Sequence, residues 1–324
     1  MSFRQGQRVG PYVIERKLGA GGMASVWLAW DERCRRNVAV KVMADAIESE
    51  SQIAARFLDE IRHHAVLRHP SIVAVRDVFS TGGQPCLVMD LAPGGSLATL
   101  LDERPGRRLP AAVALPLIGE VLDALDYAHR QGMVHRDVKP SNVLLDVSRQ
   151  HALLSDFGVA LATGERRRTR AGQSVGTTAY MSPEQIRATG TIDYRSDVYS
   201  VGCVLYELLT GRPPFVVESG RDASDDDDAT ARATVLGMHL NRKPVAPRVR
   251  VRAIPRHVSD LVMRALEKDP ARRVPGCAEF RRLLFAPPGW RGHVRQWLSS
   301  PVAIAAALAV AMAAVLGTMA IMIS

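Results

Sequence analysis

The sequence predicts an α+β fold in which strands come first, helices follow, and one transmembrane helix closes the chain. Residues 12–43 contain three short β-type runs, residues 110–131 have the pattern of a long helix, and residues 302–323 are apolar and uncharged. The chain has 324 residues, of which 47% are hydrophobic, so it can build one large or two moderate domains around a substantial core.

Composition narrows the classes of protein to which the chain can belong. Its four cysteines are scattered without paired spacing, so we expect a reducing compartment and neither a disulfide framework nor a zinc site. Residues 1–6 lack an apolar segment, so we expect no signal peptide. The net charge of +9 suits an anionic partner. No aromatic residues alternate with the basic clusters, so we expect no direct nucleic-acid partner, and an anionic membrane surface fits better.

Residues 12–43 predict three strands with a glycine-rich loop between the first two. The loop, residues 18–26, contains Gly19, Gly21 and Gly22. Glycines let a backbone approach phosphates closely and expose its N–H groups, although a simple hairpin turn would also use them. The third strand carries Lys41 at an alternating, outward-reaching position.

A helix is predicted over residues 49–67, because Ile53, Phe57, Glu60 and Leu67 fall on one face of it. Glu60 is thus directed inward, and an unpaired buried carboxylate is energetically expensive, so it needs a partner. A partly solvated helix acid is the alternative.

Two more strands are predicted at residues 72–75 and 86–89, and a turn at residues 93–95. The long helix over residues 110–131 follows. Pro116 inside it should kink or restart the helix, because proline removes a backbone donor.

Residues 133–145 contain the main candidate catalytic residues of the chain. Asp137, Lys139 and Asn142 stand in the pattern H-R-D-x-K-x-x-N between short apolar runs. These three residue types suit phosphoryl transfer. The carboxylate orients a hydroxyl and takes its proton, the lysine offers positive charge to the moving phosphoryl group, and the amide oxygen binds a metal ion.

The motifs, taken in order, resemble those of protein kinases over residues 10–285. They are the glycine-rich loop with Ala24 in place of its third glycine, V-A-V-K, H-R-D-x-K-x-x-N, Asp156-Phe157-Gly158, and Ser182-Pro183-Glu184 with serine in place of alanine. The G-G-M form of the loop is similar to that of bacterial, eukaryotic-like serine/threonine protein kinases. The resemblance implies a protein-kinase-like fold of two lobes with ATP between them: a small β-rich N-lobe at residues 10–90 and a larger helical C-lobe at residues 93–285.

The resemblance also implies how ATP is bound. Lys41, paired with Glu60, would hold the α and β phosphates. Val26 and Ala39 would cover one face of the adenine, and Leu144 the other. The expected nucleotide-binding residues are Leu18, Gly19, Gly21, Gly22, Val26, Ala39, Lys41, Glu60, Met89, Asp90, Ala92 and Leu144.

By the same resemblance Asp137 is the catalytic base, assisted by Lys139. Asn142 and Asp156 would hold Mg²⁺, with Mn²⁺ as the alternative ion. Lys139, two residues after the base, favours serine or threonine over tyrosine. The implied reaction is transfer of the ATP γ-phosphoryl group to protein hydroxyls.

Residues 159–182 are polar and arginine-rich and resemble a kinase activation loop. Thr169 and Ser174 are its candidate autophosphorylation sites. A phosphate adds about −1.5 to −2 charge, so it can pair with Arg136 and order the loop. A permanently solvated basic loop without a regulatory role is the alternative.

Other residues are expected to be structural. Asp197 resembles the aspartate that holds the catalytic-loop backbone, and Arg273 the arginine that pairs with Glu184. Residues 219–230, which include four consecutive aspartates at 225–228, are expected to form a disordered surface insertion, since like charges resist compaction. A docking or metal-binding role for this insertion is left open.

The C-terminal part is expected to anchor the chain in the cell membrane. Residues 286–300 form a basic linker whose two tryptophans suit a membrane interface. Residues 301–323 form the transmembrane helix, and the uncharged run 302–323 would span roughly 33 Å, enough to cross a bilayer. Arg291 and Arg295 place the kinase side in the cytoplasm of a single-pass protein with no folded domain beyond the span. A stripe of small residues in the helix supports the hypothesis of a homodimer.

Two alternatives to an active protein kinase remain. A membrane-anchored pseudokinase would bind nucleotide and partners without catalysis, but Lys41, Asp137 and Asp156 are all intact. A small-molecule phosphotransferase on a related fold usually lacks the activation segment that Gly176-Thr177 and residues 182–184 indicate.

Overall fold

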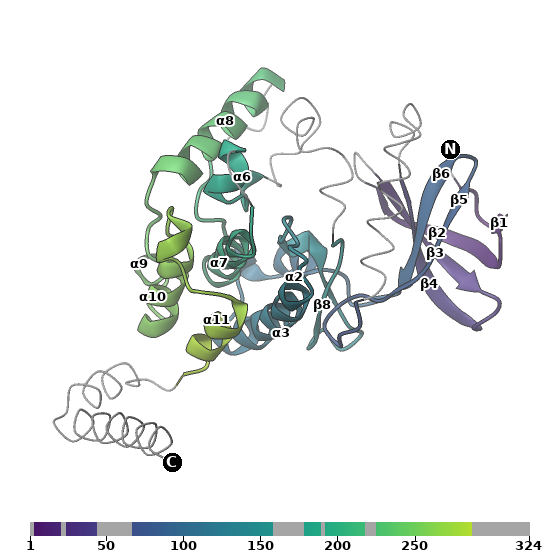
Figure 1. Cartoon of the computed structure of the whole chain (residues 1–324), viewed down its shortest axis with the longest axis horizontal. Coiled ribbons are helices and arrows are strands. Elements are labelled where there is room, and N and C mark those ends of the chain that lie inside the picture. Colours follow the sequence, from purple (N-terminus) through teal and green to yellow (C-terminus); the bar gives the residue numbers. More distant parts are fainter. Residues whose placement is uncertain are drawn as a thin grey trace, which may run out of the picture. The chain divides into compact units, whose positions relative to one another are not determined.

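The computed structural model describes residues 3–20, 24–43, 67–157, 178–188, 192–217 and 225–286 (Figure 1). The chain divides into two compact units, Met1–Leu284 and Phe285–Ser324. All the helices and strands described below lie in the first unit.

The N-terminal part is one antiparallel sheet of six strands in the order β1-β2-β3-β4-β6-β5 (Figure 1). The three strands predicted over residues 12–43 are confirmed as β2, β3 and β4. The strands are β1 (Arg8–Val9), β2 (Tyr12–Ala20), β3 (Ala24–Asp31), β4 (Arg36–Met43), β5 (Val75–Thr81) and β6 (Gln84–Asp90).

The strand predicted at residues 72–75 is wrong in its bounds, because β5 begins only at Val75. Ile72 instead forms a single bridge to Leu154, and the Val73 N–H donates to the Leu154 carbonyl at 3.0 Å. The run is apolar because Ile72 is buried in the main core cluster of the helical part, and Val73 in the cluster that contains Ala39 of the sheet.

Alternation along β4 sends its side chains to two different apolar clusters. Val38, Val40 and Val42 join the cluster on one face of the sheet. Ala39 belongs to the cluster on the other face. Lys41 shares the parity of Ala39, so it extends from that second face.

The second part of the unit is helical, with one small hairpin. Its main core cluster includes buried residues of α3 and α7, and α3 contacts α7, α11 and β8. The elements are α2 (Leu97–Asp102), η2 (Pro105–Arg107), α3 (Ala111–Arg130), η3 (Pro140–Asn142), β7 (Val143–Leu145), β8 (Ala152–Leu154), α6 (Pro183–Arg187), α7 (Arg195–Thr210), α8 (Asp225–Asn241), α9 (Pro247–Arg250), α10 (Arg256–Ala265), η4 (Pro270–Arg272) and α11 (Cys277–Leu284).

Of the two effects expected of Pro116, a kink or a restart of the long helix, the restart does not occur, since α3 is one element from Ala111 to Arg130. Proline costs the helix one backbone hydrogen bond. Ala114, Leu117 and Ile118 around it are buried, so tertiary packing maintains the helix across that position.

The predicted disordered insertion is also wrong in part, because α8 begins at Asp225 and includes the acidic residues 225–228. Residues 218–224 lie outside the described residues. Ala231, Val235 and His239 are buried at a spacing of four, which places one stripe of the helix against the core. This stripe outweighs the repulsion among the aspartates on which the prediction rested.

No helix in the described part of the chain is both long and apolar enough to cross a bilayer. The predicted transmembrane helix, residues 301–323, and residues 287–300 of the predicted linker lie outside that part.

Candidate active site

The turn after α3 brings Asp137, Lys139 and Asn142 together. The Lys139 Nζ donates to Asp137 Oδ2 at 2.9 Å. The Asn142 Nδ2 donates to the Asp137 carbonyl at 2.8 Å and to its Oδ2 at 3.1 Å. The three residues that the sequence singled out therefore form one contact group, with a carboxylate beside a positive charge.

Asp197 in α7 holds the backbone of this turn, as predicted. Its Oδ2 accepts from the His135 N–H and its Oδ1 from the Arg136 N–H, each at 2.8 Å. The Nε2 of His129, at the end of α3, lies 2.7 Å from Oδ2. Asp197 is fully buried, so these polar partners offset the cost of removing its charge from water.

His135 connects the turn to the strand that precedes Asp156. Its Nδ1 accepts from the Asp137 N–H at 3.2 Å, which requires the proton to be on Nε2. Nε2 lies 2.8 Å from the Ser155 carbonyl. The imidazole is buried and its ring centroid is 4.6 Å from that of Phe157.

The β7–β8 hairpin places Asn142 beside Asp156. Val143 pairs with Leu154, and the Ser155 N–H donates to the Asn142 carbonyl at 2.9 Å. Asp156 has a φ of 64°, in the left-handed region that side chains other than glycine adopt only rarely. Such local strain is common at functional sites, where the surrounding structure enforces it.

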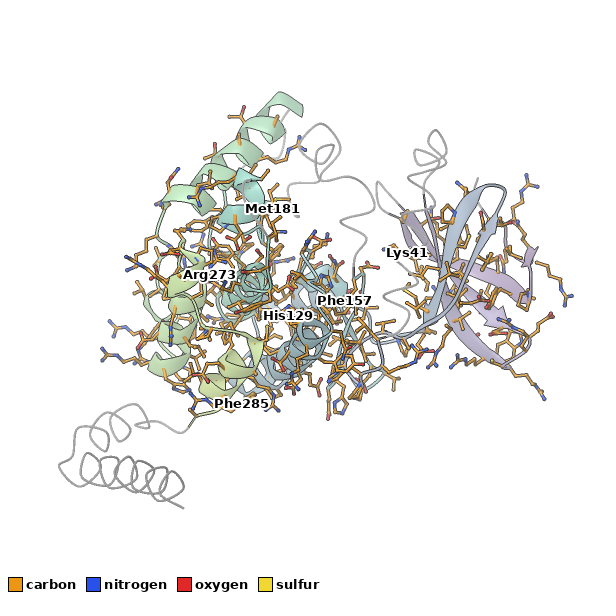
Figure 2. All side chains as sticks on the ribbon, viewed as in Figure 1. Lys41, His129, Phe157, Met181, Arg273 and Phe285 are labelled. Atoms are coloured by element: carbon orange, nitrogen blue, oxygen red, sulfur yellow. The ribbon has the colours of Figure 1, made fainter. Side chains whose placement is uncertain are left out.

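Lys41 reaches Asp156 from the sheet. Its Nζ donates to Asp156 Oδ1 at 2.6 Å. Burial by itself would raise the pKa of Asp156, but the charge and hydrogen bond of Lys41 outweigh burial and hold this pKa below its ordinary value. The carboxylate is thus kept ionised. Figure 2 shows Lys41 on the sheet and Phe157 in the helical part.

The donor set fits a hard divalent metal ion. Both hydrogen bonds of the Asn142 side chain use its nitrogen, which leaves the amide oxygen directed away from Asp137. That oxygen and the ionised Asp156 carboxylate are the ligand types that such ions prefer. A metal ion here would complete its coordination with phosphate oxygens and water.

An apolar cluster lies beside Lys41 on the same face of the sheet. It contains Ala39 and Met89, with Val26 and Leu144 packed against it. The three residues expected to cover the adenine faces and Met89, expected to bind the nucleotide, are therefore in one cluster, built by β3, β4, β6 and β7.

The segment after β6 has the geometry of a connector between sheet and helices. The Asp90 side chain pairs with Arg76 and Arg36, and its N–H donates to the Ala74 carbonyl at 3.0 Å. The Asp90 N–H is therefore not available to a nucleotide. Ala92 follows outside the strand.

Of the remaining residues predicted to bind nucleotide or to be phosphorylated, the structure describes only some. Leu18 and Gly19 lie near the end of β2, where Leu18 is exposed. The predictions that lie outside the described residues concern Gly21, Gly22, Glu60, Thr169 and Ser174.

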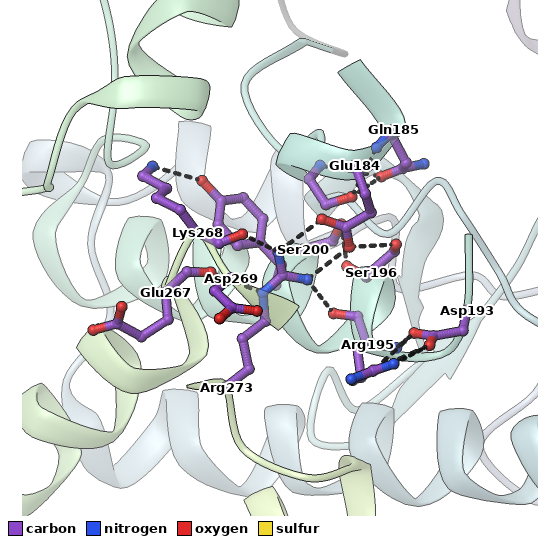
Figure 3. Close-up of polar contacts among 12 residues, drawn as sticks. Glu184, Gln185, Asp193, Arg195, Ser196, Ser200, Glu267, Lys268, Asp269 and Arg273 are labelled. Atoms are coloured by element: carbon purple, nitrogen blue, oxygen red, sulfur yellow. Dashed lines mark hydrogen bonds and ion pairs between the residues drawn. The ribbon is translucent and has the colours of Figure 1, made fainter. Parts of the chain in front are cut away.

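The predicted pairing of Arg273 with Glu184 is confirmed (Figure 3). Two nitrogens of the guanidinium donate to the two carboxylate oxygens, each at 2.7 Å. The other donors of this buried side chain bond the backbone carbonyls of Arg195, Glu267 and Lys268. Burial would raise the pKa of Glu184, but Arg273 holds it below its ordinary value.

Sequence reasoning missed one residue that supports the turn, Gln185. Its Oε1 accepts from the Ser182 N–H at 3.1 Å, which forms a capping box at the start of α6. Its Nε2 donates to the Arg136 carbonyl at 2.7 Å. The S-x-x-Q spacing of residues 182–185 is the signal that predicts the cap.

Known proteins share both the motifs and the fold. The chain matches the protein kinase domain family over residues 12–282. It is 38% identical over 272 residues to the serine/threonine-protein kinase PknJ of Mycobacterium tuberculosis, an alignment that covers 83% of this chain and 44% of PknJ. It is 36% identical over 275 residues to PknB of Mycobacterium leprae, with 83% of this chain and 42% of that protein covered. The chain thus spans less than half the length of these curated relatives.

Solved structures agree with the architecture. The kinase domain of Mycobacterium tuberculosis PknI matches with a TM-score of 0.67 at 28% identity, over 87% of this chain and 98% of that domain. The β-sheet part is accordingly the N-lobe and the helical part the C-lobe, as the sequence predicted. Together with the contacts of Asp137, Asp156 and Lys41, these matches establish that the chain belongs to the protein kinase domain family.

Proposed function

We propose that this protein is a serine/threonine protein kinase that transfers the γ-phosphoryl group of ATP to protein hydroxyls. The observation that carries the proposal is the set of contacts that join Lys41 to Asp156 and Asp137 to Lys139 and Asn142. Relatives named as serine/threonine-protein kinases support the choice of acceptor.

Each side chain has a defined task in this reaction. Asp137 orients the acceptor hydroxyl and takes its proton. Lys139, 2.9 Å from that carboxylate, adds positive charge where the phosphoryl group passes. Lys41 holds the α and β phosphates. Bound Mg²⁺, our choice of ion, would be held by Asp156 and Asn142 and would neutralise phosphate charge.

We extend the proposal to regulation and location. Thr169 and Ser174 are proposed as autophosphorylation sites, on the basis of the basic segment around them. Residues 301–323 are proposed as a single membrane span, with the kinase domain in the cytoplasm. Homodimerisation through the small residues of this span remains a hypothesis.

The test compares the full chain with Asp137→Asn, using labelled ATP, Mg²⁺ and a general protein substrate, and maps phosphosites by mass spectrometry. Asp146→Asn is the matched control, because Asp146 is an acid of the turn after β7 whose side chain serves local hydrogen bonds. We expect transfer to serine and threonine by wild type and Asp146→Asn, and a loss of at least about 100-fold in Asp137→Asn.

Other results would support other functions. ATP binding without transfer by the wild type would favour the pseudokinase. Transfer to a sugar or an antibiotic, but to no protein, would favour the small-molecule phosphotransferase.

A further inference from the structure

A continuous part of the C-lobe surface has basic residues without acidic ones. Residues 229–259 contain seven arginines and lysines and no aspartate or glutamate. Six of the seven, which we call the basic face, lie between the end of α8 and the start of α10. They are Arg242, Lys243, Arg248, Arg250, Arg252 and Arg256, and all six are exposed.

The basic face is compact because α9, in its middle, packs against both α7 and α10 (Figure 1). Pro244 and Pro247 are buried at the approach to α9 and fix its path. Arg248 donates to the Ile254 carbonyl at 2.7 Å, and Arg250 Nε donates to the Tyr206 hydroxyl at 2.6 Å. Two of the five guanidinium groups are thus held by neutral acceptors.

The charge of the basic face is not neutralised within the described residues. None of its six members forms an ion pair with an acidic side chain there. Other exposed arginines of the same domain behave differently: Arg130 pairs with Asp126, and Arg282 with Glu279. The basic face therefore presents a cluster of positive charge to any anionic partner.

Exposed apolar side chains lie among the residues of the basic face. Val249, between Arg248 and Arg250, is 75% exposed, and Val245 is 43% exposed. No aromatic residue occurs in residues 229–259, so the base-stacking groups of a single-strand nucleic-acid binder are lacking. Exposed aliphatic groups among basic ones suit the boundary between lipid headgroups and acyl chains.

We propose that the basic face docks the kinase domain on an anionic membrane surface. Its arginines and lysine would bind lipid phosphates, and Val245 and Val249 would contact the acyl boundary. The apolar run at residues 302–323 is an independent reason to expect this chain at a membrane. The proposal concerns how the folded domain is held there, and it does not depend on phosphoryl transfer.

The test places a photoreactive benzoyl-phenylalanine at Val249 of the full chain. The chain is reconstituted in nanodiscs of phosphatidylcholine, with or without phosphatidylglycerol, and crosslinks to lipid are counted. Val147 is the matched position, since it is 80% exposed and lies in the turn after β7. Each basic residue near an anionic surface strengthens binding about fivefold, so we expect Val249 to give at least about tenfold more lipid crosslinks than Val147 in anionic discs.

Two variants with four substitutions each test whether the basic face is responsible for the lipid contact of position 249. Arg242→Gln, Lys243→Gln, Arg252→Gln and Arg256→Gln together should abolish the excess at Val249. The control removes the same charge from exposed residues elsewhere in the domain, by Arg4→Gln, Arg35→Gln, Arg104→Gln and Arg108→Gln, and should preserve it. Equal crosslinking from positions 249 and 147, or in neutral and anionic discs, overturns the proposal.

Two more measurements distinguish this proposal from the proposed membrane span and from nucleic-acid binding. If alkaline extraction releases the full chain from membranes, the proposed membrane span is refuted. The crosslinking experiment, repeated with anionic vesicles, then still tests whether the basic face contacts lipid. Preferential binding of a DNA duplex over anionic vesicles at the same salt concentration would overturn the choice of partner.

Discussion

At the scale of single residues, the peptide groups on both sides of Arg136 orient the carboxylate of Asp137, the proposed catalytic base. The N–H of Arg136 donates to Asp197, and its carbonyl accepts from Gln185. Between these two bonds Arg136 has a φ of 66°, which an arginine adopts only under constraint. Asp137 follows directly, so its orientation depends on two side chains, of Asp197 and Gln185, that bond the backbone of its neighbour.

Gln185 offers a test of this dependence, because two substitutions separate its two bonds. Gln185→Glu keeps an acceptor for the capping box but cannot donate to the Arg136 carbonyl. Gln185→Ala loses both contacts. We expect Gln185→Glu to lower kcat about tenfold with little change in ATP KM or in the free energy of unfolding. Gln185→Ala should in addition lose about 1 kcal/mol of stability. Steady-state kinetics and urea unfolding measure the two effects, and an unchanged kcat in both variants would refute the positioning role.

The half-buried Glu184, paired with the buried Arg273, gives a pH-dependent prediction. Its pKa is below the ordinary value of 4.5 in the folded state, so the bond to Arg273 stabilises the fold above that pH and is lost as pH falls through the folded pKa. Glu184→Gln leaves the Arg273 charge buried without a counter-ion and should cost about 3–5 kcal/mol at pH 7.

The difference between wild type and Glu184→Gln should therefore shrink as pH falls below 4.5. Urea unfolding at several pH values measures it. Glu279→Gln, which removes an exposed partner of Arg282, is the control and should cost less than about 1 kcal/mol. A difference for Glu184→Gln that stays constant with pH would contradict the assignment.

At the scale of elements, the spacing of α7 and α10 depends on a residue without a side chain. A Cβ at Gly202 in α7 would lie 2.9 Å from the Cβ of Ala265 in α10. Only glycine lets the two helices pack this closely. Ser196 and Asp197 are in the same helix, so the packing of α7 also bears on the active site.

Two glycine substitutions test this packing. Gly202→Ala should destabilise the fold by about 1–3 kcal/mol, because the helices must separate. Gly237→Ala in α8 meets no atom within 4 Å and should instead stabilise the fold by about 0.5–1 kcal/mol through higher helix propensity. Urea unfolding compares the two, and equal effects would show that the α7–α10 contact tolerates a methyl group.

The elements also show which parts of the structure the sequence could predict. Asp137, Lys139 and Asn142 could be predicted because they stand in one contiguous motif, whose spacing suits phosphoryl transfer. The bond from Gln185 to the Arg136 carbonyl joins positions 49 apart and ends on a backbone atom, so no side-chain pattern marks it. In α8 the local repulsion of the aspartates misled the prediction, because the stripe from Ala231 to His239 gains its burial only from tertiary packing.

At the scale of the whole molecule, the chain divides into Met1–Leu284, which contains the kinase domain, and Phe285–Ser324. Among the residues that the structure describes, every member of the three core clusters lies in the first unit. Stability is set by how much apolar surface such a core buries, so we expect the first unit to be stable by itself. The uncharged run 302–323 belongs to the second unit, where it can serve attachment to a membrane.

Deletion of residues 287–324 therefore tests both halves of this division. The shortened chain should unfold in urea in one transition at the same midpoint as the full chain, and it should be extracted from membranes by alkaline carbonate while the full chain is retained. A lowered midpoint would show that the C-terminal unit packs on the kinase core. Retention of the shortened chain would show that the kinase domain inserts into the bilayer by itself, since electrostatic docking through the basic face is reversible and does not survive carbonate.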